Sequence, residues 1–81
     1  MQLYKRYVDV ICLQEKSGDI RPLWIRWEDG CNYAIDKVKN MGNRASEVGG
    51  CGVLFLCMIQ GQQRKLYYEK GVRWFIESYQ P

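Results

Sequence analysis

Four cysteines, Cys12, Cys31, Cys51 and Cys57, offer this 81-residue chain its widest choice of chemistry. They could form two disulfides or one tetrahedral zinc site, or stay as free thiols. Successive cysteines are 19, 20 and 6 positions apart, whereas structural zinc sites usually take ligands from close pairs such as C-x-x-C. Cys12 and Cys57 fall in apolar runs, where a thiol behaves as a small buried hydrophobic group. The spacing therefore predicts reduced core or surface thiols, with no metal and no cofactor.

Catalytic groups are the second kind of chemistry to consider. Histidine is absent, so the usual general base at neutral pH is missing. The motifs G-x-S-x-G and H-E-x-x-H and the phosphate-binding loop are missing as well. Of the carboxylates, Asp29 precedes a turn glycine and Asp36 lies at a predicted strand end. Cys51 stands among glycines without an identified base or cation to activate it. The sequence predicts a protein that is not an enzyme.

Basic and aromatic side chains together form a candidate nucleic-acid surface, because rings stack on bases while Lys and Arg neutralise phosphates. Twelve Lys and Arg against nine Asp and Glu give a net charge of +3, which is mild for a phosphate-binding protein. Aromatic residues in short strands also commonly pack against their cross-strand neighbours. The predicted single-stranded nucleic-acid-binding face contains Trp24, Arg26, Arg64, Lys65, Tyr67 and Arg73.

A strand that is apolar on both faces indicates a protein interface instead. Residues 51–60 place Leu54, Leu56 and Met58 on one face and the other apolar residues on the opposite face. Such a strand needs cover on both sides, and a second chain would supply it. The alternative is internal closure, with cover from Met41, Val48 and the N-terminal Leu3 and Tyr4. We rank a homodimer or protein-interaction module slightly above a nucleic-acid-binding protein.

The elements that would position these residues are all strands. Side-chain alternation predicts six of them, at about 7–13, 20–27, 33–38, 51–60, 64–69 and 72–78. Asp29-Gly30 marks a hairpin, because Gly30 can take the positive φ that the turn needs. Residues 39–50 contain three glycines and two asparagines without alternation, which predicts a long connecting loop.

The predicted fold is a single all-β domain spanning 1–81, a small six-stranded antiparallel meander that forms a partly closed SH3-like barrel. Closure would remove exposed sheet edges, although periodicity alone leaves a two-sheet sandwich open. In the second strand Leu23, Ile25 and Trp27 alternate with Pro22, Trp24 and Arg26, and the first set is expected to face the core.

The chain also carries indications of its location. Asp9 interrupts the apolar run behind the early basic pair, so no secretory signal is predicted. The longest uncharged apolar run, residues 53–59, is too short to cross a bilayer as a helix. A cytoplasmic protein without a membrane partner is expected.

Several segments resemble a family of short uncharacterised bacterial all-β proteins. They are YVDVI at 7–11, PLWIRWEDG at 22–30, YAIDKV at 33–38, GGCG at 49–52, LYYE at 66–69 and WFIE at 74–77. The W-x-D-G hairpin and the C-terminal W-F-[IV]-E strand are its most recognisable features, and the similarity spans nearly the whole chain. The resemblance implies a bacterial source, but the family has no established activity, cofactor or catalytic residue to transfer.

Overall fold

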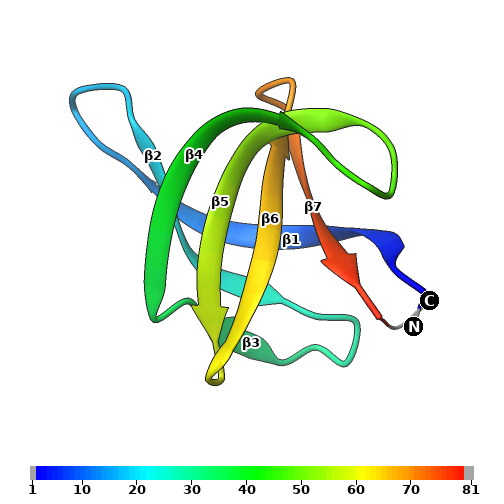
Figure 1. The fold of residues 1–81 in the computed structure, drawn as a ribbon. Helices are drawn as coiled ribbons and strands as arrows, with labels where there is room; N and C mark the ends of the chain where they lie inside the picture. Colours follow the sequence, from blue (N-terminus) through cyan, green and yellow to red (C-terminus); the bar gives the residue numbers. More distant parts are fainter. Residues whose placement is uncertain (1, 80–81) are drawn as a thin grey trace.

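The computed structural model describes residues 2–79, which form one antiparallel sheet of seven strands curled into a half-barrel (Figure 1). The strands are β1 (Tyr4–Gln14), β2 (Ile20–Arg26), β3 (Asn32–Ala34), β4 (Lys37–Ala45), β5 (Cys51–Ile59), β6 (Gln62–Glu69) and β7 (Arg73–Ser78). Their order in the sheet is β3-β2-β1-β7-β6-β5-β4. The all-β prediction is confirmed, with seven strands rather than six. Residues 2–79 contain no helix of the length and apolarity that crossing a membrane requires.

Two segments connect the halves of the sheet and produce its curl. β1 belongs to both halves, because residues 4–8 pair with β7 while residues 9–14 pair with β2. On the other side of the sheet, the short link between β3 and β4 also bonds to both halves. There the N–H of Ile35 donates to the carbonyl of Leu23 in β2 at 2.9 Å, and the N–H of Asp36 donates to a carbonyl of β5 at 2.8 Å. The inner face of the sheet therefore surrounds a common interior.

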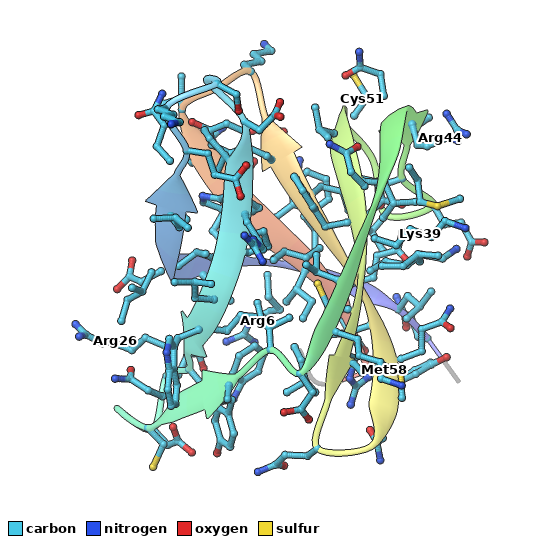
Figure 2. All side chains as sticks on the ribbon, turned by 90° about the vertical axis from the view of Figure 1, so that its left-hand side faces the viewer. Arg6, Arg26, Lys39, Arg44, Cys51 and Met58 are labelled. Carbon is cyan, nitrogen blue, oxygen red and sulfur yellow. The ribbon has the colours of Figure 1, made fainter. Side chains whose placement is uncertain are left out.

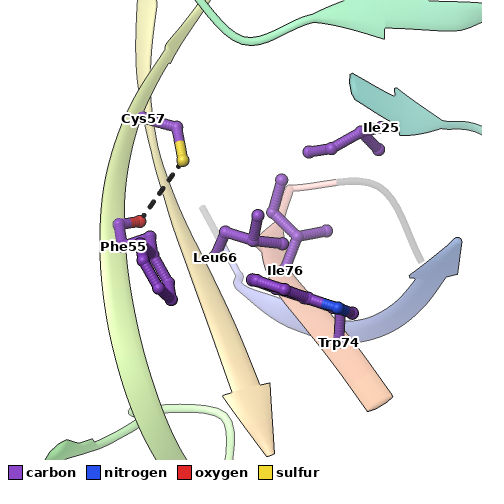
Figure 3. Close-up of a cluster of buried hydrophobic side chains, with 6 residues drawn as sticks. All are labelled: Ile25, Phe55, Cys57, Leu66, Trp74 and Ile76. Atoms are coloured by element: carbon purple, nitrogen blue, oxygen red, sulfur yellow. Dashed lines mark hydrogen bonds between the residues drawn. The ribbon is translucent and has the colours of Figure 1, made fainter. Parts of the chain in front are cut away.

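The first hydrophobic cluster fills that interior (Figure 3). Its buried members are Ile25, Phe55, Cys57, Leu66, Trp74 and Ile76. They come from four strands at every second position, as the alternation predicted. The ring of Trp74 lies 5.5 Å from that of Phe55 and 4.5 Å from that of Tyr68, between ring centroids. Large aromatic contacts of this kind supply much of the burial that a small domain needs.

A second cluster lies on the outer face of β5, β6 and β7. Leu54, Tyr67 and Phe75 are buried there under Met41, Val48 and Leu56. The β4–β5 hairpin arches over this face (Figure 1), and its connection is held by Ser46, whose hydroxyl donates to Glu77 at 2.7 Å. The chain thus covers much of this strand face itself, with Met41 and Val48 in the role that the internal-closure alternative gave them.

The long connection predicted at about 39–50 is wrong for most of its length. Residues 37–45 form β4, and only residues 46–50 connect it to β5. β4 is an edge strand with a register shift between Asn40 and Asn43, where Gly42 has a φ of 77°. An exposed edge interrupted by a bulge does not show the alternation of a half-buried strand, so side-chain pattern alone misses it.

A second bulge corrects the predicted faces of β2. Ile11 pairs with Trp24 but Cys12 pairs with Pro22, so that Leu23 is skipped. Pro22 is almost completely buried, although strict alternation placed it outside. Ile25 is buried, Trp27 packs against the first cluster and Trp24 is 43% exposed, as predicted. Leu23, the bulged residue, is only partly buried and belongs to neither cluster, so its predicted place in the core is wrong.

Candidate functional site

One end of the half-barrel is an open cleft of about 360 Å³, which we call the end cleft. It lies between the β2–β3 hairpin, the β5–β6 turn and the end of β7. Its lining is Ile25, Trp27, Tyr33, Ile59, Gln60, Gln62, Arg64, Ile76, Ser78 and Tyr79. Core residues thus form an apolar floor, with aromatic rings and amides around it. This mixture is typical of sites that hold a small group by shape and a few polar contacts.

Hydrogen bonds fix two side chains of the end cleft. The hydroxyl of Tyr33 donates to Asp29 at 2.8 Å, and the backbone N–H of Cys31 donates to the same carboxylate at 2.8 Å. The bond from Cys31 lowers the pKa of Asp29, while the bond to Asp29 raises the pKa of Tyr33. Arg64 donates to the side-chain oxygen of Gln62 at 2.7 Å. Arg64 is the only charged side chain among the described residues that line the cleft.

A second surface lies on the outer face of β4, β5 and β6, and we call it the lysine-rimmed face. It consists of the half-buried Leu56 and Met58 with Lys37, Lys39 and Lys65 around them. Register places these residues together, since Leu56 lies directly between Lys39 and Lys65 while Met58 pairs with Lys37. Among residues 2–79, none of the three lysines has an acidic partner.

The positive charge of the chain is concentrated in the segment that contains most of this face. Residues 37–65 contain five basic side chains and one acidic side chain, a net charge of +4. The other residues contain seven basic and eight acidic side chains, so they carry −1. A mild total of +3 therefore hides a strongly asymmetric distribution of charge along the chain.

The predicted nucleic-acid face does not form one surface. Trp24 and Arg26 lie on the exposed side of β2, Arg64 lines the end cleft and Lys65 belongs to the lysine-rimmed face. Figure 2 shows Arg26 on the opposite side of the molecule from Lys39 and Arg44. Tyr67 is only 2% exposed, and it stacks on a neighbouring ring with centroids 4.8 Å apart. Its predicted role in stacking on bases is wrong, because its ring belongs to the second cluster.

Arg73, the sixth residue of that prediction, is occupied by an ion pair. Its Nε donates to Glu69 at 2.8 Å, and its guanidinium lies 4.2 Å from the ring centroid of Tyr7. Lys5 contacts the same carboxylate at 3.2 Å. The bond from Arg73, with a smaller contribution from Lys5, lowers the pKa of Glu69. This group therefore fastens β1 to the β6–β7 turn.

The predicted interface residues divide between two roles. Leu54 is buried in the second cluster and cannot contact a partner directly. Leu56 and Met58 remain half-exposed at the lysine-rimmed face. Sequence reasoning found these two but did not link Lys37, in the predicted strand 33–38, or Lys39, in the predicted loop, to this face. The alternating Lys-Val-Lys at 37–39 was the signal available for them.

Apart from Arg64, the polar and aromatic residues of the end cleft were not predicted as site residues. Trp27 was expected in the core, Tyr33 falls at the start of the predicted strand 33–38 and Gln62 falls between two predicted strands, without a link between them. Their meeting depends on the curl of the sheet, which brings the β2–β3 and β5–β6 turns to the same end.

The cysteines have different environments. Cys57 is fully buried, and its thiol donates to the carbonyl of Phe55 at 3.5 Å. Cys12, Cys31 and Cys51 are exposed, so burial of Cys12 was predicted wrongly. Within residues 2–79, no three His, Cys, Asp or Glu side chains are grouped closely enough to hold a metal ion.

This difference predicts how the thiols react. We expect Ellman's reagent to modify Cys12, Cys31 and Cys51 readily in the native protein and Cys57 at least about a hundredfold more slowly, because that thiol needs an opening of the core. Absorbance at neutral pH follows the reaction, and guanidinium should release the fourth thiol. Four equally fast thiols would contradict the buried position of Cys57.

Comparisons with family models, with curated proteins and with solved structures each find no match to this chain. The resemblance stated above therefore stays a prediction, and functional inference rests on the geometry of the two surfaces.

Proposed function

We propose that this protein is a non-enzymatic interaction module that docks an acidic segment of a partner protein on the lysine-rimmed face. The observation that carries the proposal is the arrangement of Lys37, Lys39 and Lys65, without acidic partners among the described residues, around the half-exposed Leu56 and Met58. Apolar groups flanked by lysines suit a ligand with aliphatic and acidic side chains. The flexible side chain of Met58 can adapt to such a ligand.

Charge also favours an acidic partner over a second copy of the chain. A twofold dimer built on this face would bring the lysines of one copy close to those of the other. Like charges across an interface disfavour such pairing, so we propose a heterologous partner. The SH3-like barrel is likewise a proposal, supported by the curled sheet and by the strand β1 that its two halves share.

A second candidate function is binding of single-stranded nucleic acid, and the end cleft favours it. Trp27, Tyr33 and Tyr79 offer rings there beside Arg64. The lysine-rimmed face does not favour it, because its centre is aliphatic and the nearby Tyr67 is buried.

The proposal is tested with a synthetic peptide in which leucine and glutamate alternate. We expect fluorescence anisotropy at about 0.15 M salt to show binding, and the triple variant Lys37→Glu/Lys39→Glu/Lys65→Glu to weaken it by about tenfold or more, because three attractive contacts become repulsive. Met58→Glu should weaken binding of the same peptide, because it places a charge in the apolar centre of the face. An uncharged peptide of serine and leucine measures the part of binding that does not depend on charge.

The matched control reverses three exposed basic residues elsewhere, in Lys16→Glu/Arg26→Glu/Lys70→Glu. It has the same net charge as the first triple variant and should bind the peptide much like the unmodified protein. Equal weakening by both triple variants would show that net charge, and not this face, attracts the peptide. Sedimentation that detects a dimer dissociated by Met58→Glu would replace the acidic partner with a second copy.

A further inference from the structure

We propose that the end cleft binds a nucleotide, free or at the end of a single strand, with its base against the aromatic walls and its phosphate at Arg64. The inference rests on the second candidate function and does not depend on the lysine-rimmed face. Of the residues that the sequence suggested for that function it keeps only Arg64, because Trp24 and Arg26 lie outside this cleft.

The cleft has the size and the rigid walls that a single base requires. Its volume of about 360 Å³ lies within the range of small-ligand sites. Tyr33 is fixed through its hydroxyl bond to Asp29, and Trp27 packs against the first cluster with the guanidinium of Arg6 at 5.7 Å from its ring centroid. Rings that are already held in place lose little freedom when a base stacks on them.

The charge of the cleft selects an anion. Arg64 has a neutral partner, Gln62, and none of the described residues forms an ion pair with it. Neither carboxylate of the nearest hairpin lines the cleft, since Glu28 is paired with Arg6 and Asp29 accepts the bonds of its turn. A planar guanidinium in this state can donate two parallel hydrogen bonds to a phosphate.

A peptide with an aromatic residue next to a carboxylate is the alternative ligand. The side-chain amides at the rim favour a nucleotide over such a peptide. Gln60 and Gln62 both line the cleft and carry hydrogen-bond donors and acceptors. A base presents donors and acceptors along its edges, and proteins recognise unpaired bases by combining such bonds with stacking. The side chain of phenylalanine would leave these amides without a ligand partner.

Nuclear magnetic resonance titration of the whole chain tests the inference, with the four common ribonucleoside monophosphates as probes. We expect shifts at the side-chain amides of Gln60 and Gln62, at Nε of Arg64 and at the indole of Trp27. The indole of Trp24 and Nε of Arg26 serve as internal controls and should not move. No shift at the cleft with any of the four at millimolar concentration, or equal shifts at Arg26, would overturn the proposal.

Variants distinguish the contribution of the phosphate to binding from that of the base. Arg64→Gln should weaken a monophosphate by about tenfold or more but leave the parent nucleoside unaffected, whereas Arg26→Gln should change neither. A 5′-phosphorylated tetranucleotide that binds more tightly than the mononucleotide identifies a strand end as the ligand, and equal affinity identifies a free nucleotide.

The competing peptide ligand is tested in the same titration. Tighter binding of a blocked aspartyl-phenylalanine peptide than of any nucleotide would overturn the inference and make the cleft a peptide site. The variant Lys37→Glu/Lys39→Glu/Lys65→Glu should still bind nucleotides at about 0.15 M salt, because its substitutions lie outside the cleft. Loss of peptide binding in that variant with nucleotide binding retained therefore tests the two sites independently.

Discussion

Replacing Phe75 with alanine is expected to lower the free energy of unfolding by about 3 to 5 kcal/mol. The side chain of Phe75 is fully buried, stacks on Tyr67 with an angle of 8° between the rings, and meets the edge of Tyr7 at 6.0 Å between centroids. Alanine would remove these contacts and leave a cavity beneath the β4–β5 connection. A domain of 81 residues has a total stability of about 4 to 12 kcal/mol, so this loss would remove at least about a quarter of it.

Urea unfolding followed by circular dichroism measures the effect at neutral pH. Val72→Ala is the control, because Val72 is 78% exposed in the β6–β7 turn and its truncation should change stability by less than about 0.5 kcal/mol. Phe75→Leu should lie between the two variants, since leucine keeps most of the buried surface. A loss below about 1 kcal/mol in Phe75→Ala would show that the second cluster contributes little to the fold.

This second cluster shows what side-chain pattern could and could not predict. Alternation along the predicted strand 72–78 puts Trp74 and Ile76 on one face and Phe75 on the other, and the structure places the first two in the inner cluster and Phe75 in the outer one. It could not show that Phe75 is buried there. The cover comes from Met41 and Val48, which lie far along the chain in a segment without a periodic signal. Burial of an outer face is a long-range property, and local pattern does not encode it.

The same limit applies to the prediction of the candidate surfaces. Leu56 and Met58 could be identified from the sequence, because a strand apolar on both faces is visible in the residue order. Their lysine neighbours depend on register, since Lys39 and Lys65 come together only through pairing of β4 and β6 with β5. The end cleft depends on the curl of the sheet, so Arg64 was predicted as a binding residue but Trp27, Tyr33 and Gln62 could not be linked to it beforehand. Inner faces are local and were predicted except at the bulge of β2, whereas the grouping of residues into sites is long-range and was not.

Burial of Cys57 and Tyr67 also makes the stability of the fold depend on pH in the alkaline range. Burial raises the pKa of the Cys57 thiol from 9.0 to about 12, and burial together with the charge of Glu77 raises the pKa of Tyr67 from 10.0 to about 12. The unfolded chain therefore loses these protons near pH 9 and 10, while the folded chain keeps them up to about pH 12. Their contribution to stability is complete below pH 9 and is lost as the pH rises towards 12.

The expected result is a steep fall in unfolding free energy between pH 8.5 and 11.5, measured from urea curves at constant ionic strength. At about 1.4 kcal/mol for each pKa unit, the shifts amount to roughly 4 kcal/mol for Cys57 and 3 kcal/mol for Tyr67 as upper limits. Cys57→Ala/Tyr67→Phe should be less stable at pH 8, because it loses packing and the hydrogen bond to Glu77, yet its stability should fall less steeply. Tyr79→Phe, which removes an exposed phenol, should keep the original slope. Equal slopes in the double variant and the unmodified protein would mean that neither group keeps its proton in the folded state, and that the two clusters admit water where the structure shows them closed.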